Sequence, residues 1–501
     1  MLQTWEPVIG LEVHAELLTQ SKMFCSCAVI QDYAAAQPNT HVCPVCLALP
    51  GSLPVINARA VEFVIKTGLA LNCTVGEFNI FARKNYFYPD LPKGYQISQY
   101  EYPLCQKGWL EIEAADNGMG MPLLRRIGVT RVHLEEDTAK LTHAEGASLV
   151  DFNRAGVPLM EIVSEPDMRS VDEVKAYASK VHTLLRYIGV SSGDMEKGAM
   201  RFEANISVRP AGSSKLFTRT EVKNLNSFRA LVRATEYEIE RQIRVVESGG
   251  EIVQETMGWN EMRGETYPQR GKEHAHDYRY FPEPDLLPVE ISRTEVERIR
   301  ATLPELPDAK HDRFLTQYGL SRYDAALLTA EQAVADYFEA CANLGAAREY
   351  AKSQISNFKL IANWMTGELF RLMNETGVSI EQVKVKPTDL VALIELVNDG
   401  KVNQNTAKLV FADMFATGEP PAAMIERKGL AQVSDADELA AIVERVLDES
   451  PKQVSEYLGG KEQLFKWLLG QVMRATQGKA NPQVATEVLK AAVEKWRKHS
   501  L

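Results

Sequence analysis

Hydrophobic and polar residues alternate one by one in several segments of the first half of the chain. The segments are residues 8–17, 130–137, 149–154 and 200–209. A period of two places successive side chains on opposite faces of a strand, and antiparallel sheets commonly have one apolar and one polar face. We therefore predict strands that share a polar face. Its positions are Glu12, His14, Glu16, Arg131, His133, Glu135, Asp151, Asn153, Arg201, Glu203, Asn205, Ser207 and Arg209.

Helical spacing marks two segments between these strands. Ser170 and Glu173 form a capping box ahead of apolar residues at helical intervals, and Gly189 ends this helix. A second helix is predicted for residues 227–247. From about residue 291 onward one helical pattern follows another, and prolines divide them.

These patterns predict an α+β fold class. An antiparallel-sheet domain would be followed by an all-helical domain and a helical tail domain. We place their limits at residues 1–293, 294–404 and 405–501. The length of 501 residues agrees with several domains, because one hydrophobic core rarely serves so long a chain.

Composition and charge narrow the range of partners. The hydrophobic content of 45% and charged content of 25% are ordinary for a soluble globular protein. The net charge of −11 means that a nucleic acid would have to bind at local basic patches, such as residues 495–498. The chain shows neither a secretion signal nor an apolar window long enough to span a membrane, so we expect a cytoplasmic location and no membrane partner.

The composition of the predicted polar face favours a binding site. Solvated strands usually carry Thr, Lys and scattered Glu, whereas these positions carry His, Asp, Asn, Glu and Arg, which are weaker strand formers and better ligands. A merely wet face remains the alternative. Acids with one or two histidines and no thiolates suit a hard cation such as magnesium, which usually bridges to phosphates. The face therefore indicates nucleotide chemistry.

The common phosphate-binding loops are missing from the sequence. It contains no Gly-x-x-x-x-Gly-Lys-Ser/Thr motif, and Gly118-Met119-Gly120 lacks the third glycine of a dinucleotide fingerprint. Phosphates would have to be held by the metal and by arginines such as Arg201 and Arg209.

Four cysteines form two close pairs. Cys25 and Cys27 are followed, after a loop, by Cys43 and Cys46. In a reducing compartment such pairs predict a closed tetrahedral zinc site, which leaves no position for a substrate and is therefore structural. The alternative is a set of reduced, buried thiols.

Residues 277–285 combine acids, an arginine and aromatics with two prolines. Proline removes backbone donors, so the segment cannot be a helix interior and makes a poor central strand. We predict a rigid functional loop. The alternative is an aromatic-rich closing strand whose charges face water.

Several motifs, in one order along the chain, resemble those of a known family. They are residues 8–14, 83–90, 94–99, 134–137, 149–154, 161–167, 223–227, 277–285 and 478–481. The family is that of the B subunits of aspartyl/glutamyl-tRNA amidotransferases. The resemblance covers nearly the whole chain.

The resemblance implies a ligase of protein biosynthesis. Such an enzyme uses ATP to activate the side-chain carboxylate of Glu or Asp on a misacylated tRNA, and then forms the amide with ammonia. The glutaminase (amidase-type) partner would supply the ammonia, and a third, small partner would complete a heterotrimer. The family architecture is a cradle-like catalytic domain, a helical domain and a tail that contacts tRNA. Glu-tRNA(Gln), Asp-tRNA(Asn) or both remain possible substrates.

The polar face and the resemblance together give a set of candidate residues. The expected magnesium ligands are Glu12, His14, Glu135, Glu136, Asp151 and Glu161. The expected catalytic residues are Glu12, His14, Glu136 and Arg201. The expected ATP-binding residues are Arg201, Glu203, Asn205 and Arg209. Many family members lack the four cysteines, so zinc would not be needed for the reaction.

Two other classes of function compete with this interpretation. A non-catalytic RNA-binding scaffold would use zinc and the polar face only to shape a docking surface. A metal-dependent hydrolase would turn over without ATP.

Overall fold

The computed structural model describes residues 4–30, 33, 35–116, 122–271, 278–346, 354–430, 436–476, 480 and 482–499. Asp277, Gly118-Met119-Gly120 and most of the motif at residues 478–481 lie outside the described residues. The strands are β1 (Trp5–Glu16), β2 (Thr74–Val75), β3 (Phe78–Asn79), β4 (Ala82–Asn85), β5 (Tyr95–Ser98), β6 (Cys105–Asp116), β7 (Pro122–Glu136), β8 (Lys140–Ala144), β9 (Ala147–Asp151), β10 (Pro158–Ser164), β11 (Met200–Pro210), β12 (Thr220–Leu225), β13 (Glu255–Asn260), β14 (Glu265–Gly271), β15 (Phe281–Pro282) and β16 (Val289–Glu290).

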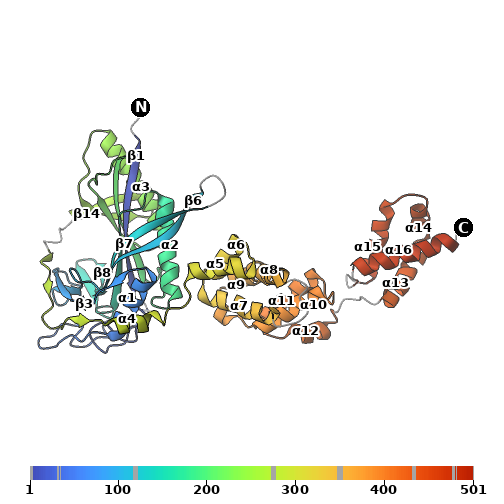
Figure 1. Cartoon of the computed structure of the whole chain (residues 1–501), viewed down its shortest axis with the longest axis horizontal. Coiled ribbons are helices and arrows are strands. Elements are labelled where there is room, and N and C mark those ends of the chain that lie inside the picture. Colours follow the sequence, from blue (N-terminus) through green and yellow to red (C-terminus); the bar gives the residue numbers. More distant parts are fainter. Residues whose placement is uncertain are drawn as a thin grey trace. The chain divides into compact units, whose positions relative to one another are not determined.

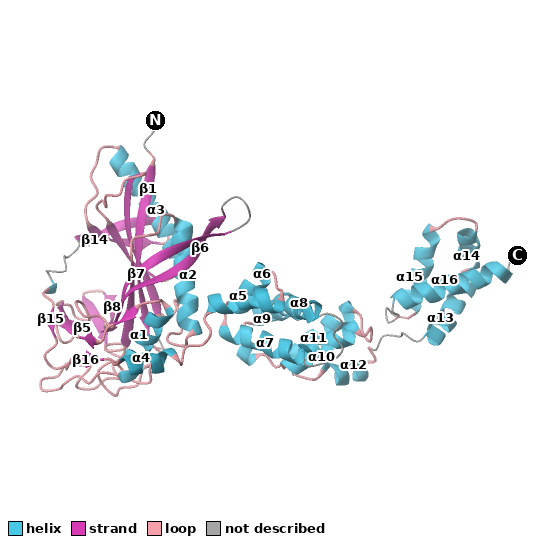
Figure 2. Cartoon of the chain, in the orientation of Figure 1, coloured by secondary structure: helices cyan, strands magenta, loops and turns pink. Residues whose placement is uncertain are grey.

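A few helices lie between strands along the chain, and the others fill the C-terminal half (Figure 2). They are α1 (Ala58–Ala70), α2 (Val171–Tyr187), α3 (Phe228–Glu247), α4 (Arg293–Arg300), α5 (Pro307–Tyr318), α6 (Arg322–Thr329), α7 (Gln332–Ala346), α8 (Gln354–Trp364), α9 (Phe370–Thr376), α10 (Pro387–Asn398), α11 (Gln404–Thr417), α12 (Pro421–Lys428), α13 (Ala436–Asp448), α14 (Pro451–Leu458), α15 (Gln463–Ala475) and α16 (Pro482–His499). A π-helical turn at Met365–Leu369 joins α8 to α9, and a short 3-10 helix lies at Ile380–Gln382. The α+β fold class is confirmed.

A nine-stranded sheet forms the frame of the N-terminal domain (Figure 1). Its order is β14-β13-β12-β11-β1-β10-β7-β6-β2, so β1 lies at the centre. β1 pairs antiparallel with both β10 and β11, while β12 and β13 run parallel. The predicted strands at residues 8–17, 130–137 and 200–209 all belong to this sheet.

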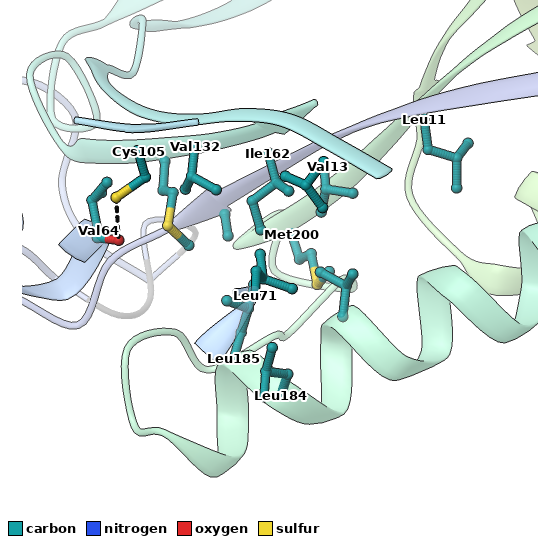
Figure 3. Packing of buried hydrophobic residues seen from close by; sticks show 14 of the residues in the cluster. Leu11, Val13, Val64, Leu71, Cys105, Val132, Ile162, Leu184, Leu185 and Met200 are labelled. Atoms are coloured by element: carbon teal, nitrogen blue, oxygen red, sulfur yellow. Dashed lines mark hydrogen bonds between the residues drawn. The ribbon is translucent and has the colours of Figure 1, made fainter. Parts of the chain in front are cut away.

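The apolar face of the sheet is covered by helices. Val13 of β1 and Ile162 of β10 lie on the side of the sheet that carries Leu184 of α2, and Val64 of α1 lies beside Cys105 of β6 (Figure 3). The helix predicted at the capping box is α2, and Oγ of Ser170 accepts a hydrogen bond from the backbone N–H of Glu173. The second predicted helix is α3. Because the core occupies one face, the other face is left for polar side chains.

Three smaller sheets surround the frame. Their strand orders are β15-β4-β5, β16-β3 and β8-β9. β9 contains Asp151 and pairs with β8 in a hairpin, so the prediction that residues 149–154 share the main polar face is wrong. The alternation correctly indicates a strand, but a period of two does not determine which other strand pairs with it.

The chain divides into two compact units, residues 1–307 and 308–501. The second unit contains two hydrophobic clusters, one running from Phe314 to Ile425 and one from Leu439 to Val493. The predicted division after residue 404 falls within the first turn of α11, and both α10 and α11 contribute to the first of these clusters. The domain limits stay a prediction. Within the described residues, no helix is both long enough and apolar enough to cross a membrane.

Candidate active site

Polar side chains from neighbouring strands come together at the centre of the main sheet. β1 places His14 opposite Glu161 of β10 on one side and opposite Arg201 of β11 on the other. Glu161 in turn lies opposite His133 of β7. Glu12 lies opposite Glu203 of β11. The alternation seen in the sequence therefore builds a continuous polar patch across β7, β10, β1 and β11.

One group on this patch, which we call the histidine cluster, consists of His14, Glu135 and Glu161, all buried. Nε2 of His14 lies 3.3 Å from Oε2 of Glu161 and 3.7 Å from Oε1 of Glu135. Nε2 of His133 lies 3.7 Å from the same Glu161 oxygen. The Nδ1 atoms of His14 and His133 are buried without a hydrogen-bond partner among the described residues. This donor set fits a divalent cation that accepts oxygen and imidazole ligands.

A second group, the carboxylate cluster, consists of Glu12, Glu203 and Glu221. Nδ2 of Asn205 donates to Oε1 of Glu12 at 2.9 Å, and Nζ of Lys223 lies 2.8 Å from Oε2 of Glu203. Glu221 extends from β12, where it lies opposite Asn205. One oxygen of each carboxylate lies within 4.8 Å of the others, so all three could bind the same ion. Such a set suits a hard cation such as magnesium.

Crowding of like charges shifts the ionisation of these acids. Burial and the carboxylates of Glu161 and Glu203 raise the pKa of Glu12 to about 7. Burial also raises the pKa of Glu135, with Glu161 as the next cause. Burial alone would raise the pKa of Glu203, but Lys223, His14 and Arg201 together outweigh it and lower this pKa to about 2. A bound divalent cation would relieve the repulsion that raises the pKa values of Glu12 and Glu135.

A cavity of about 460 Å³ adjoins the patch, and we call it the cation-lined cavity. The cations along its wall are Lys84, Arg154, Arg201 and Lys223. Nη1 of Arg201 lies 3.4 Å from Oδ2 of Asp137, which fixes its guanidinium at the wall. Burial opposes the charge of Lys84, but Tyr280 and Glu135 outweigh it and raise its pKa above the usual value. Four cations around a cavity of this size suit the phosphates of a nucleotide.

Glu136 does not lie with Glu12 and His14, which corrects the predicted site. Successive residues of a strand point to opposite faces, so Glu135 faces the histidine cluster and Glu136 does not. One oxygen of Glu136 accepts a hydrogen bond from the backbone N–H of Ile97 at 2.9 Å and lies 2.6 Å from Nζ of Lys93. The alternation in the sequence already separates the two acids, because Glu135 continues the series of Arg131 and His133 and Glu136 does not.

Two further predicted residues lie apart from the clusters. Oδ1 of Asp151 accepts hydrogen bonds from the backbone N–H groups of Asn39 and Asn153 within the hairpin region. Nε of Arg209 donates to Oε2 of Glu6 at 2.8 Å, near the other end of β1. Arg201, Glu203 and Asn205, in contrast, belong to the patch.

The candidate set omitted Lys84, Lys223 and Glu221. Residues 220–225 read Thr-Glu-Val-Lys-Asn-Leu, so Glu221 and Lys223 alternate with Thr220 and Val222. The same period of two that revealed the other strands would have identified this one. Lys84 had no comparable signal, because its position depends on the packing of a separate small sheet.

The four cysteines lie together. The sulfur atoms of Cys25, Cys27, Cys43 and Cys46 are all within 4.8 Å of one another, and the Sγ atoms of Cys43 and Cys46 are 3.9 Å apart. Tetrahedral zinc with bonds of about 2.3 Å requires sulfurs roughly 3.8 Å apart. Burial and the neighbouring thiols raise the pKa of Cys27 to about 11. The cluster fits a structural zinc site.

The aromatic segment after residue 277 is part loop and part strand. Phe281 and Pro282 form β15, which pairs with β4. Glu283 is buried, and its two oxygens accept hydrogen bonds from Nε and Nη2 of Arg83 at 2.7 and 2.8 Å. The alternative of a strand whose charges all face water is therefore wrong for Glu283.

Two protein-family models match segments of the chain. Residues 7–297 match the GatB/GatE catalytic domain, and residues 347–493 match the GatB domain. A protein of Thermoanaerobacter pseudethanolicus is 52% identical over 492 residues, which cover 98% of this chain and 100% of that protein. A protein of Dehalococcoides mccartyi is 52% identical over 497 residues, covering 98% and 99%. One of Thermodesulfovibrio yellowstonii is 51% identical over 486 residues, covering 97% and 98%.

All three relatives are named as the B subunit of aspartyl/glutamyl-tRNA(Asn/Gln) amidotransferase. The resemblance seen in the sequence motifs is thus confirmed over the full length. The chain belongs to the family of B subunits of aspartyl/glutamyl-tRNA(Asn/Gln) amidotransferases.

Proposed function

We propose that this chain is one component of a ligase that amidates glutamate or aspartate esterified to tRNA, and that it activates the side-chain carboxylate with ATP. The names of its full-length relatives support tRNA-dependent amidation. The observation that best supports the activation step is that two groups of possible metal ligands, the histidine cluster and the carboxylate cluster, lie next to the cation-lined cavity.

The proposed reaction has two steps. First, an oxygen of the substrate carboxylate attacks the γ-phosphorus of ATP, and the bond to the β,γ-bridging oxygen breaks to give an acyl phosphate and ADP. Second, ammonia attacks the acyl carbon, phosphate leaves with the bonding electrons, and the nitrogen loses a proton to give the amide. The glutaminase (amidase-type) partner would release the ammonia from glutamine, and a third, small partner would complete the assembly.

The side chains of the patch have distinct roles in this proposal. Lys84, Arg201 and Lys223 bind phosphate oxygens, because they line the cavity with their charged groups. The histidine cluster and the carboxylate cluster would hold Mg²⁺, which supplies neutralisation of phosphate charge. Without that neutralisation, the negative carboxylate and the phosphates would repel each other.

The cavity also has to exclude water, because water hydrolyses an acyl phosphate. Tyr86 and Tyr278 both line the cavity, and their ring centroids are 6.3 Å apart. We propose that these rings restrict the access of water to the intermediate.

The four cysteines would hold one structural Zn²⁺. The cysteines lie in the excursion between Met23 and Gly51, which is part of the connection from β1 to α1. Four thiolates would fill every coordination position of a tetrahedral zinc ion and leave none for a substrate. Its role is to fix this excursion, and the activation step does not involve it.

Contact with tRNA is assigned to the helical tail. The chain has a net charge of −11, so the phosphate backbone requires a local basic surface. Lys495 and Arg497 are exposed on α16. These residues give the tail the charge that such a surface needs.

The test uses the complex reconstituted with its partner proteins. We expect His14→Ala and Glu161→Gln to lower acyl-tRNA-dependent phosphate release from ATP by at least about 100-fold, the loss typical when a group that stabilises transition-state charge is removed. The control is Glu240→Gln, which changes an exposed carboxylate on α3 and should leave the rate unchanged.

Two outcomes would contradict the proposal. Phosphate release that stays at the wild-type rate in both site variants would favour the non-catalytic RNA-binding scaffold. Turnover of the acylated tRNA without ATP would favour the metal-dependent hydrolase.

A further inference from the structure

A second cavity is lined by residues of β4 and β15 of the small sheet and has no part in the activation chemistry described above. Its volume is about 410 Å³. Among the residues that line it are Tyr100, Tyr102, Arg279, Tyr280 and Phe281. We call it the aromatic pocket. Tyr100, Tyr102 and Phe281 are 40%, 47% and 44% exposed, so their ring faces are accessible from solvent.

The rings of this pocket already show the geometry of base stacking. Tyr100 and Tyr280 are stacked, with ring centroids 4.4 Å apart and planes at 11°. Flat, exposed aromatic faces are the usual means by which proteins hold unpaired nucleotides. Neither tyrosine is among the described residues that form the hydrophobic core of this domain, so the core does not account for their stacking.

The charge of the pocket limits which nucleotide it can hold. Arg279 is its one cation among the lining residues, and Glu101 is its one acid. Arg279 has φ of 43°, a left-handed conformation that is costly for this residue type and is typical of functional loops. A single guanidinium suits one phosphodiester. It is too little charge for a triphosphate, which the four cations of the other cavity suit better.

The pocket adjoins the reaction site through one side chain. Burial raises the pKa of Tyr280 to about 12, and the charges of Lys84 and Glu135 also act on its hydroxyl. The Tyr280 ring stacks on Tyr100 in the pocket, and its centroid lies 6.2 Å from that of Tyr278, which lines the cation-lined cavity. In an acylated tRNA, only the terminal ribose separates the amino acid from the terminal adenine. A base site for that adenosine therefore has to lie directly beside the reaction site.

We infer that the aromatic pocket binds the unpaired 3′-terminal nucleotides of the acylated tRNA, with the terminal adenine stacked on Tyr100 and Arg279 contacting a phosphodiester. This inference rests on the proposed function, because it names how the substrate is positioned for activation. Phe87 extends the surface: it is 79% exposed, and the guanidinium carbon of Arg279 lies 5.9 Å from its ring centroid. A second base of the single-stranded end can stack there.

The experiment measures the steady-state constants of the reconstituted complex for acylated tRNA and for ATP separately. Tyr100→Leu removes the stacking face and should raise the KM for acylated tRNA about 10-fold, since loss of base stacking costs roughly 5-fold to 100-fold in affinity. Tyr100→Phe keeps the ring and should stay within about twofold of wild type. Arg279→Ala should also raise this KM. The KM for ATP should be unchanged in all three variants.

The matched control is Tyr267→Leu, because Tyr267 is 43% exposed on β14 at the edge of the main sheet. The trinucleotide CCA serves as a direct probe. It should inhibit the wild-type complex competitively against acylated tRNA, and inhibit the Tyr100→Leu complex about 10-fold more weakly.

Three outcomes would overturn the inference. A raised KM for ATP with an unchanged KM for acylated tRNA would assign the pocket to the base of ATP. Unchanged constants in both Tyr100→Leu and Arg279→Ala would show that the pocket holds no substrate, and equal effects of Tyr100→Phe and Tyr100→Leu would exclude stacking. In each case acyl-tRNA-dependent phosphate release would persist, so the proposed function would stand. Absence of that release from the wild-type complex would instead contradict the proposed function.

Discussion

Glu12 shows how single side chains determine the chemistry of the patch. It shares the patch with Glu161, Glu203 and Glu221, and this crowding together with burial raises its pKa to about 7. Carboxylates that repel one another in a buried site gain most from a divalent cation, because the cation removes the repulsion and supplies ligand bonds. Metal affinity at this position should therefore be sensitive to the loss of one charge.

We expect Glu12→Gln to lower the affinity for Mn²⁺ by at least about 10-fold, as for other changes in the shell of a metal site. Titration of the purified protein with Mn²⁺, followed by the electron paramagnetic resonance of the free ion, measures this directly. Glu240→Gln is the matched control, since its carboxylate is 62% exposed. Equal Mn²⁺ affinity in Glu12→Gln and wild type would rule out the carboxylate cluster as a metal site.

Glu238 illustrates a buried acid that serves the fold. Its carboxylate accepts hydrogen bonds from Thr220, Arg241, Gln242 and Thr266. Burial alone would raise the pKa of Glu238, but these donors, led by Arg241, lower it. A lowered pKa in the folded state stabilises the protein above the unfolded-state pKa of roughly 4.3. This stabilisation is lost as the pH falls through the folded-state pKa.

Glu238→Gln should lower the free energy of unfolding at pH 7 by about 2–4 kcal/mol, because donors that faced a carboxylate then face an amide. The difference from wild type should shrink as the pH falls below about 4. Hydrogen exchange of α3 and β12, measured between pH 7 and pH 3, reports on this region alone. A difference that does not depend on pH would contradict the assigned role of the charge.

At the level of secondary structure, the sequence predicts which faces are polar better than which strands are neighbours. The period of two placed Glu12, His14 and Glu203 on one side of their strands correctly. Strand order depends on contacts between segments far apart in sequence, and no local pattern encodes them. For this reason the hairpin strand with Asp151 was assigned to the wrong sheet, and the two-residue strands β3, β15 and β16 were not predicted.

At the end of β7 the alternation could have separated two adjacent acids. It continues from Arg131 and His133 to Glu135, which places Glu136 on the opposite face, where it contacts Lys93. The proximity of the four cysteines was predictable, since two close pairs in the sequence are typical of a four-cysteine site whatever the rest of the fold.

The cysteine excursion between β1 and α1 gives a prediction for a structural element. Cys43→Ser should abolish zinc binding and lower the melting temperature, while leaving phosphate release measurable at low temperature, because the proposed zinc would stabilise the excursion and take no part in activation. Metal content and thermal unfolding are measured on the same samples. Cys341→Ser is the control: Cys341 is a buried thiol of α7, so the change should not alter zinc content. Loss of catalysis at full stability would contradict a structural role.

The division of the chain into separate cores defines how the proposed tRNA contact of the tail can be tested. The last hydrophobic cluster runs from Leu439 to Val493, while α12 packs into the preceding cluster through Met424 and Ile425. A truncation after Leu430 removes the last cluster and leaves the preceding one intact. A cut after residue 417 would remove buried residues of the preceding cluster.

Deletion of the residues after Leu430 should raise the KM for acylated tRNA by roughly 10-fold and change kcat little, because it removes basic contacts far in sequence from the reaction site. Steady-state kinetics of the reconstituted complex test this, with circular dichroism to verify that the remaining helices are folded. A loss confined to kcat would count against the assignment of the tail.

In the proposed activation step, the polar face of the main sheet holds divalent cations beside a nucleotide. Crystals of the complex grown with Mn²⁺ and a non-hydrolysable ATP analogue test it directly through anomalous diffraction. The account predicts anomalous peaks among His14, Glu135 and Glu161 and among Glu12, Glu203 and Glu221, with phosphates at Lys84, Arg201 and Lys223. Mn²⁺ bound only elsewhere, or an analogue bound away from this face, would contradict it.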